Sequence, residues 1–270
     1  METENDKQKF SASTRSKLGL VLGIAGIATL TTAIVVVALS AFGRIEWTQA
    51  LTLVYWCAAA AALALLLIVV FALVRRRRGR PFFQLWPVLG AASAVVVVAY
   101  AVDWVAAWVE HPAIHDVSTD LADPPTFAVL PLRADNLDAV PGSDRRSMAN
   151  LNPRQRWAAI HQDEYPGIRS VRIDDGAADV LEKAGRLARD RGWDIEENSP
   201  QGRLEARGTA TLLAMPFIVV VEARPSGDGT ASLIDMRMIA ETGRSDHGVL
   251  AEEVESFLAD LSGTTTAVRQ

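Results

Sequence analysis

The chain has 270 residues, of which 50% are hydrophobic and 22% charged, with a formal net charge of −5. Residues 109–270 hold 27 acidic and 17 basic side chains, and so acidic a surface repels phosphate, which excludes a basic nucleic-acid-binding protein. Cys57 is the single cysteine, which excludes a disulfide framework and a zinc site built on thiolates.

Three long apolar stretches occupy the first part of the chain. Residues 18–42 and 50–74 contain no charged residue, and residues 85–109 contain one, Asp103, near their far end. About 20 apolar residues in a helix cross the hydrocarbon core of a bilayer. The sequence therefore predicts an α-helical transmembrane region of three helices over residues 18–109.

The basic residues predict how these helices are oriented. Short loops rich in arginine and lysine stay in the cytoplasm. The first connection has Arg44 against Glu46, whereas the second has a cluster without any acid. We therefore expect a multi-pass protein of the bacterial inner membrane, with a cytoplasmic tail over residues 1–17 and a periplasmic or extracytoplasmic C-terminal domain. The cluster comprises Arg75, Arg76, Arg77, Arg78 and Arg80.

Three features of this region leave alternatives open. Residues 38–41, Ala-Leu-Ser-Ala, resemble a signal-peptide cleavage site, although the apolar stretch before them is longer than a signal peptide requires. Asp103 is either a functional intramembrane carboxylate or a side chain that reaches the outer interface beside Trp104. Gly19 and Gly23 form a G-x-x-x-G pattern that can bring two helices close, a weak signal in any apolar run.

Residues 110–168 form a proline-rich segment without sustained helical periodicity. They contain seven prolines, which exclude a long helix and predict an extended arm. One short helix is expected from Pro153 to about Asp163, with Asn152 as its N-cap. The apolar run at residues 127–130 indicates that the arm packs on the domain that follows.

Residues 169–262 predict an α+β domain, an antiparallel sheet with two main helices on one face, in the order β-α-β-β-β-β-α. The first helix has apolar residues at helical spacing from Ala177 to Ala188, is expected to be capped by Asp174 or Asp175, and ends at Gly192. Residues 263–270 are expected to be a disordered tail. Strands are expected at residues 169–173, 193–197, 202–211, 217–223 and 231–241, a hairpin turn at 225–229, and a last helix with Leu250, Val254, Phe257, Leu258 and Leu261 on one face.

Short motifs between residues 115 and 261 resemble those of the bacterial family with the domain of unknown function 1499 (DUF1499). The resemblance implies an envelope-associated domain with no assigned activity. The chain departs from the family pattern at residues 215–218, Met-Pro-Phe-Ile, where members often carry Phe-x-Asp-Asp, and at Ala240-Glu241, where Ser-Arg is expected. If those charged groups support a family activity, this chain lacks them. The matching motifs are Ile-His-Asp-Val-Ser-Thr-Asp at 114–120, Pro-Pro-Thr-Phe at 124–127, Tyr-Pro-Gly-Ile at 165–168, Gly192-Trp193, and Gly-Arg-Ser-Asp-His-Gly at 243–248.

The densest set of possible metal ligands lies at the start of the arm. Imidazole and carboxylate groups suit zinc or another divalent metal, but the spacing is loose and thiolates are missing. The alternative is that His115 and Asp116 hydrogen-bond the arm to the domain, while Ser118, Thr119 and Asp120 form turns through side-chain bonds to the backbone. We therefore expect neither a metal nor another cofactor. The set comprises His111, His115, Asp116, Asp120 and Asp123.

Ser245, Asp246 and His247 contain the residue types of a hydrolytic triad. Consecutive residues cannot point at one another in the relay that activates a serine, and the surrounding sequence is not a nucleophile elbow. A better interpretation is that Ser245 or Asp246 caps the last helix. His161 stands at the end of the short arm helix, where a solvated position is expected.

These features favour two functions over a third. The first is a membrane-anchored cell-envelope protein whose extracytoplasmic domain is a binding or structural module and not an enzyme. The alternative is an envelope hydrolase or metal-dependent enzyme that uses the region of His115 and Asp116; transport or signalling through the helices is third. The expected partner is the lipid bilayer, with another envelope protein or a lipid as a further candidate; nucleic acid is not expected, and the oligomeric state stays open. The candidate functional residues are His115, Asp116, Ser118, Asp120, Ser245 and Asp246.

Overall fold

A computed structural model of the chain describes residues 2–80, 84–138, 140–226 and 230–263, with the backbone alone for residues 2–16. The chain divides into two compact units, Met1–Ala106 and Ala107–Gln270. The first unit is helical, and the second contains the sheet with its helices. The expected combination of three apolar helices and an α+β domain is confirmed.

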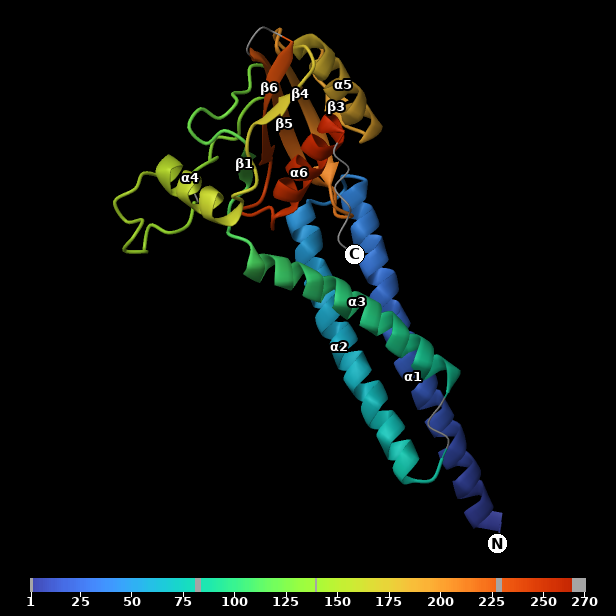
Figure 1. Cartoon of the computed structure of the whole chain (residues 1–270). Coiled ribbons are helices and arrows are strands. Elements are labelled where there is room, and N and C mark those ends of the chain that lie inside the picture. Colours follow the sequence, from blue (N-terminus) through green and yellow to red (C-terminus); the bar gives the residue numbers. More distant parts are fainter. Residues whose placement is uncertain (1, 81–83, 139, 227–229, 264–270) are drawn as a thin grey trace. The chain divides into compact units, whose positions relative to one another are not determined.

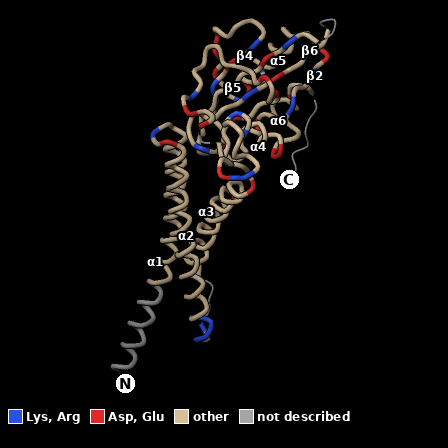
Figure 2. The backbone as a smooth tube through the Cα atoms, turned by 90° about the vertical axis from the view of Figure 1, so that its left-hand side faces the viewer, with Lys and Arg blue, Asp and Glu red and all other residues tan. Residues whose placement is uncertain are grey.

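The first unit contains three helices that are long and apolar enough to cross a membrane. They are α1 (Glu2–Ala41), α2 (Trp47–Arg77) and α3 (Leu85–Glu110), and the last turn of α3 belongs to the second unit. Figure 2 shows the arginine cluster as a blue segment at the end of α2, next to helices that are almost free of charge. Asp103 is an exposed side chain of α3 beside the buried Trp104.

Small residues bring the apolar helices close together. A Cβ added to Gly23 would lie 2.3 Å from the carbonyl oxygen of Trp86, and one added to Gly26 would lie 2.2 Å from the carbonyl oxygen of Gly90. Because the neighbouring atoms are backbone, no side chain fits between α1 and α3 at this point. The G-x-x-x-G residue Gly23 thus takes part in a close helix contact, together with Gly26 and Gly90.

The second unit is built on a six-stranded sheet, and the strands of the described residues pair in antiparallel fashion. The strand order is β1-β6-β5-β4-β3, and β2 pairs with β6 beside β1. The predicted order β-α-β-β-β-β-α matches β2 to α6; β1, which the sequence analysis placed in the extended arm, adds a further strand. The elements are β1 (Asp116–Ser118), α4 (Pro153–Glu164), β2 (Val171–Ile173), α5 (Ala177–Asp190), β3 (Asp194–Ile195), β4 (Arg203–Ala210), β5 (Met215–Ser226), β6 (Ala231–Ala240) and α6 (Val249–Ser262).

The two faces of the sheet have different covers (Figure 1). Helices α5 and α6 cover one face, where Trp193 stacks on Phe257 at 4.9 Å and meets Phe217 edge-on at 5.4 Å between ring centroids. The chain between β1 and β2 covers the other face, where Leu130 packs against Ile218 and Ile239. Successive side chains of a strand point to opposite faces of the sheet. Because both faces are covered, β5 side chains on both faces are buried. The strand therefore lacks the apolar–polar alternation of a strand with one face in water.

Several local predictions can be compared with these elements. The cap of α4 is confirmed, because Asn152 Oδ1 accepts from the Gln155 amide at 2.9 Å. The predicted cap of α5 is wrong: Gly176 holds the N-cap position, while the Asp175 carbonyl accepts a bond from Ser232. The strand expected at residues 193–197 is only Asp194–Ile195, since Gly192 turns the chain at a φ of 77° just before it.

Two predictions concern parts of the chain at the limits of the description. The β5–β6 hairpin is present, with Ser226 paired to Ala231, but residues 227–229 of its turn lie outside the described residues. Helix α6 ends before Gly263, and residues 264–270 of the expected tail also lie outside them.

Candidate functional site

Asp116 is buried at the start of β1 and makes an ion pair with the sheet. Its Oδ1 accepts from Arg237 Nε at 2.9 Å, and its Oδ2 accepts from Arg237 Nη2 at 2.7 Å and from Asn136 Nδ2 at 2.6 Å. Arg237 lies on β6, and its guanidinium also stands 5.9 Å from the ring centroid of Trp157. Asp116 therefore connects the strand β6 to two parts of the arm.

Ser118 and Asp120 make local turns. Ser118 Oγ donates to the Asp120 carbonyl at 2.9 Å, and Asp120 Oδ1 accepts from the amides of Ala122 at 2.9 Å and Asp123 at 3.0 Å. These bonds agree with the turn-forming interpretation of the sequence. Thr119 departs from that interpretation, because its hydroxyl bonds to buried Asp235 of β6 at 3.2 Å.

His115 is buried beside the turn that precedes α6. Its Nδ1 lies 3.4 Å from the Arg244 carbonyl, and its Nε2 has no hydrogen-bond partner among the described residues. Burial lowers the pKa of His115, and the positive charge of Arg133 acts in the same direction. The surroundings of the ring therefore favour its neutral form.

Ser245 and Asp246 shape the turn before α6. The side chain of Asp246 accepts from the Leu250 amide at 2.8 Å and so caps the first turn, although the N-cap position itself belongs to Gly248. Ser245 Oγ accepts from the His247 amide at 3.0 Å, outside the helix. Burial raises the pKa of Asp246 to about 6. The prediction that Ser245 or Asp246 caps the last helix is thus met by Asp246.

Gly248 is required at its position for two reasons. Its φ of 82° lies in the left-handed region, and a Cβ there would stand 2.6 Å from the His111 ring. His111 Nδ1 lies 3.2 Å from Glu164 Oε1, and its ring packs against Tyr165 at 6.1 Å between centroids. The start of the arm, the end of α4 and the turn before α6 therefore meet around His111.

His161 is fully buried, so the solvated position predicted for it is wrong. Its Nε2 accepts from the Ser118 amide at 3.2 Å, and its ring contacts Trp157 at 5.8 Å and Tyr165 at 5.4 Å between centroids. Burial lowers the pKa of His161 to about 4 and raises the pKa of Tyr165. Most residues of α4 are polar or charged. Its buried side chains are those of Trp157, Ile160 and His161.

The possible metal ligands do not come together. Among the described residues, no group of three or more His, Cys, Asp or Glu side chains could hold a metal ion. Asp116 is engaged by Arg237, Asp120 by the following amides, and His111 by Glu164. The structure brings His115, Ser245 and Asp246 together around residues 112–114, whereas Asp116, Ser118 and Asp120 face the arm side of the sheet.

Two buried carboxylates were missed in the sequence. Glu205 of β4 accepts three arm amides, from Ala128 at 2.6 Å, Val129 at 3.0 Å and Leu130 at 2.9 Å. Asp235 of β6 accepts from Thr119 and Ser170 and pairs with Arg224. The alternating pattern places both on the face opposite the helices, which would be taken for a solvated face unless the arm is known to cover it.

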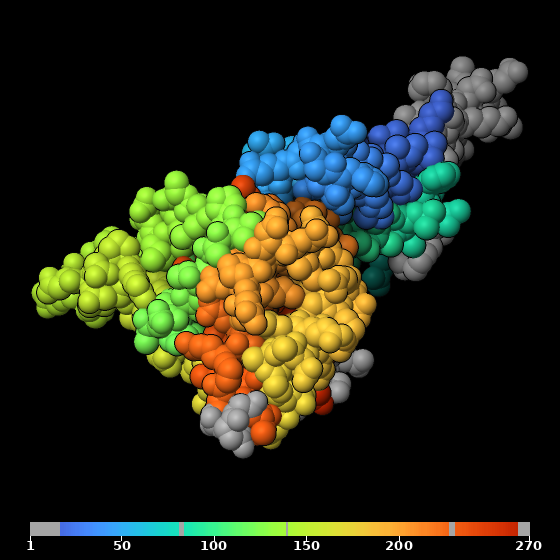
Figure 3. Space-filling view, turned by 90° about the horizontal axis from the view of Figure 1, so that it is seen from above, coloured from blue at the N-terminus to red at the C-terminus, as the bar shows by residue number. Residues whose placement is uncertain are grey.

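A cavity of about 620 Å³ lies between α5 and the segment from β3 to the start of β4. In the space-filling view the yellow atoms of α5 adjoin the amber atoms of that segment (Figure 3). Its apolar lining is Leu181, Trp193, Ile195 and Leu204. A pocket of this volume, with an aromatic wall and several charged groups, has the composition of a small-molecule or peptide site.

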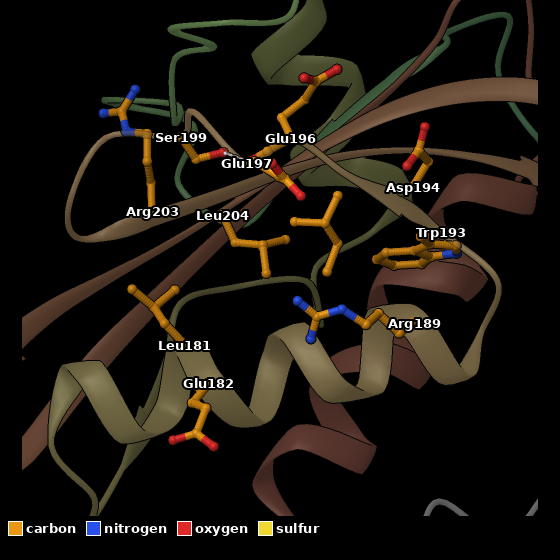
Figure 4. A pocket seen from close by; sticks show the side chains of 11 residues that line it. Leu181, Glu182, Arg189, Trp193, Asp194, Glu196, Glu197, Ser199, Arg203 and Leu204 are labelled. Carbon is orange, nitrogen blue, oxygen red and sulfur yellow. Dashed lines mark hydrogen bonds between the residues drawn. The ribbon is translucent and has the colours of Figure 1, made fainter.

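The charged side chains of this cavity are only partly engaged. Figure 4 shows the Arg189 guanidinium reaching toward the middle and the Glu197 carboxylate pointing in from the opposite side. Arg203 is bound to Glu222 at 2.7 Å and points away. Arg189, Asp194 and Glu197 make no ion pair with any described residue. Arg189 and Glu197 therefore point into the cavity without an ion-pair partner among the described residues, whereas the Asp194 carboxylate points away from α5 (Figure 4).

A second cavity of about 550 Å³ lies between residues 167–172 and α6. Its rim includes Ser262, and the chain continues from there into residues 264–270, outside the described residues. The cavity beside α5, in contrast, is surrounded by residues that the structure describes.

The chain was compared with protein families and with curated proteins, and a family model matches it. The model of a family described as "Protein of unknown function (DUF1499)" matches residues 116–261, which is more than half of the chain. None of the curated proteins compared with the chain matches it. The matched region begins with β1 and ends in α6, so it covers the sheet, most of the arm and the cavity beside α5.

Proposed function

The chain belongs to the DUF1499 family of proteins of unknown function, and we propose that it is a membrane-anchored binding module of the bacterial cell envelope. In this proposal α1, α2 and α3 cross the inner membrane, and the α+β domain lies on the periplasmic or extracytoplasmic side. The arginines after α2 support this orientation, because basic loops remain in the cytoplasm. The length and the apolar composition of the three helices support the membrane anchor itself.

The observation that carries the binding role is the cavity beside α5, with its unpaired charges over an apolar floor. Arg189 suits a carboxylate or phosphate, while Glu197 suits an amine. Leu181, Ile195 and Leu204 offer aliphatic surface between these charges. The ligand class is therefore a zwitterion with an apolar portion, such as a short peptide with free ends.

The alternative enzymatic function receives less support from the geometry. An acid, base or nucleophile must reach a substrate, whereas Asp116 is enclosed by Arg237 and Asn136 and Asp246 is fully buried. Ser245 accepts a backbone hydrogen bond and has no histidine within hydrogen-bond distance among the described residues. We therefore favour binding over hydrolysis or metal catalysis.

The binding role can be tested with the full chain in lipid nanodiscs. The probe is leucyl-leucine with free ends, compared with its N-acetyl amide, and calorimetry measures the dissociation constant. We expect saturable binding of the free-ended peptide. Its affinity should fall about tenfold or more in Arg189→Gln, because one charge-assisted hydrogen bond is worth about 1.5 kcal/mol or more.

Arg186→Gln is the matched control. It removes the same charge from the same helix, but Arg186 is exposed, pairs with Glu182 and does not line the cavity. Its affinity should equal that of the unmodified chain. Equal binding of the free and blocked peptides, or equal loss in both variants, would contradict the zwitterion site.

A further inference from the structure

One end of the sheet collects four chain segments, and we call it the entry end. The strand pairs Asp116↔Ile239 and Phe217↔Ala240 place the start of β1 beside the end of β6 and the start of β5. Ala210↔Met215 adds the end of β4. The β4–β5 turn, residues 211–214, therefore projects beyond the entry end.

The chain reaches the entry end directly from α3. Five residues separate Glu110, the last residue of α3, from Asp116 of β1. Even a fully extended connection of this length covers only about 20 Å, at roughly 3.3–3.6 Å per residue. The connection is shorter than that, because His111 continues the helix through a bond to the Ala107 carbonyl and residues 112–114 form a turn. The entry end therefore stays close to the last residues of α3.

Exposed apolar side chains are concentrated at this end. Among the described residues after Glu110, the large hydrophobic side chains with high exposure are Val129, Leu132 and Leu212, and Leu212 is the most exposed at 68%. Leu212 lies in the β4–β5 turn. Leu132 follows Leu130, which packs on Ile218 and Ile239, and precedes Arg133, which donates to the Ala240 and Gly243 carbonyls.

The backbone of the β4–β5 turn holds Leu212 outward. Leu213 is fully buried, and its amide bonds to Thr211 Oγ1 at 3.2 Å. Thr211 and Ala214 have φ values of 67° and 53°, in a region that β-branched and other non-glycine residues rarely occupy. Such strain persists only where the surrounding structure imposes it, and here it presents a leucine to the surroundings of the fold.

The charges around the turn are compatible with a lipid surface. Arg207 is paired with Glu241 and Arg133 with Asp135, so these groups are locally neutral. Arg244 is exposed, and within the described residues its guanidinium has no hydrogen-bond or ion-pair partner. A free arginine beside exposed leucines suits the headgroup region, where phosphate and acyl chains meet.

We propose that the entry end docks on the bilayer that anchors the chain, with Leu212 and Leu132 inserted among the lipids and Arg244 at the headgroup phosphates. This inference rests on the membrane anchor of the proposed function and is independent of the cavity beside α5. The occupant is the lipid surface, because the short connection after α3 keeps this end within reach of it. The docking fixes the orientation of the domain relative to the bilayer.

Lipid-borne fluorescence quenching tests the docking in the full chain. Cys57→Ala removes the native thiol, and a single environment-sensitive fluorophore is attached at Leu212→Cys. The protein is placed in nanodiscs of phosphatidylcholine and phosphatidylglycerol, with or without brominated acyl chains. We expect the label at position 212 to lose most of its intensity to the brominated lipid and to show a blue-shifted emission.

Two further labels make the outcome decisive. Gln201→Cys is exposed at the opposite end of β4 and should not be quenched. Leu66→Cys is exposed on α2 and should be quenched in any case if this helix crosses the bilayer. Quenching at 66 without quenching at 212 would overturn the docking alone, whereas no quenching at 66 would overturn the anchor. Equal quenching at 201 and 212 would show that the domain has no preferred orientation and would also overturn the docking.

Discussion

Asp116 and Asp246 show how the environment of a carboxylate decides its role. Asp116 receives three hydrogen bonds from Arg237 and Asn136, so its charge is neutralised within the fold. Asp246 is equally buried, but it accepts the Leu250 amide on one oxygen while its Oδ1 has no partner among the described residues. The charge of Asp246 is therefore costly, and its pKa rises to about 6.

Asp246→Asn should stabilise the domain at neutral and alkaline pH. The pKa of Asp246 is raised from 3.8 in the unfolded chain to about 6 in the folded protein. Protonated Asp246 therefore contributes fully to the free energy of unfolding below about pH 4, and this contribution is lost as the pH rises through 6. The cost of ionisation approaches roughly 3 kcal/mol at pH 8, at about 1.4 kcal/mol per pKa unit. Asparagine keeps an oxygen for the Leu250 amide and cannot ionise.

Thermal unfolding of both proteins between pH 4 and 8 measures this difference. The melting temperatures should be similar near pH 4 and diverge in favour of Asp246→Asn as the pH rises. Asp246→Ala is the control, because it removes both the charge and the cap and leaves the Leu250 amide unpaired. A constant difference over the whole pH range would contradict the ionisation argument.

Glu205→Gln should release the arm from the sheet. A carboxylate can accept all three amides of Ala128, Val129 and Leu130, whereas the NH₂ group of glutamine faces one or two of these donors. Each buried amide left unpaired costs about 1–3 kcal/mol. Hydrogen–deuterium exchange should then increase in residues 127–131, with a smaller change in β5 and β6.

Glu222→Gln provides the comparison for Glu205. It lies on the same face of the sheet and pairs with Arg203, but it accepts no arm amide. Its exchange pattern in the arm should resemble that of the unmodified chain. Equal protection of residues 127–131 in Glu205→Gln would show that the apolar contacts of Leu130 hold the arm without the carboxylate.

At the scale of elements, structural features that depend on nearby residues were predicted better than features that depend on distant parts of the chain. The cap of α4 depends on Asn152 and Gln155, three residues apart, and the spacing alone reveals it. The strand β1 is three residues long and forms only because β6, more than one hundred residues later, offers its free edge. The burial of His161 likewise depends on β1, since its partner is the Ser118 amide. Sequence patterns within one segment do not contain such pairings.

The candidate site shows the same division. The motifs at residues 114–120 and 243–248 drew attention to His115 and Asp246, and the structure places both at one turn. The cavity beside α5 has no motif, because its lining comes from a helix, a two-residue strand and the start of the next strand. In the sequence, Arg189 and Glu197 cannot be distinguished from ordinary surface charges, because only the packing of α5 beside β3 brings them to one cavity.

Gly90→Val should destabilise the packing of the apolar helices. A Cβ on Gly90 would stand 2.6 Å from the Gly23 carbonyl oxygen, so α1 and α3 must separate. Overpacking of this kind costs about 1–3 kcal/mol, and backbone contacts do not yield easily. Ala92→Val adds apolar volume to an exposed position of the same helix and should have little effect. Thermal unfolding of the detergent-solubilised chain, followed by circular dichroism, compares the two; equal melting temperatures would contradict the close contact.

At the scale of the whole molecule, the two units have separate cores. Ala33, Ala61, Ala94 and Val97 form a cluster within the helical unit, whereas Phe217, Phe257 and Met238 are buried within the α+β unit. We therefore expect a fragment of residues 110–270 to fold in water without the apolar helices. Circular dichroism and cooperative amide exchange measure this. A fragment that remains unfolded would show that the α+β unit depends on the helices for its stability.

The last expectation concerns the orientation of the chain in the membrane. The arginine cluster at the end of α2 contains no acidic residue, whereas the connection between α1 and α2 balances Arg44 with Glu46. The cluster comprises Arg75, Arg76, Arg77, Arg78 and Arg80. Basic side chains near helix ends resist translocation, so the loop after α2 should stay in the cytoplasm and α3 should carry the chain outward. Alkaline phosphatase is active only after export, so a fusion after residue 120 should be active and one at residue 78 inactive. Replacing the five arginines by glutamine should weaken this difference, because the remaining signal is then confined to the basic residues of the first 17 positions. The opposite pattern of activity in the unmodified chain would place the α+β domain in the cytoplasm, and would overturn the envelope location while leaving the cavity beside α5 and its ligand class intact.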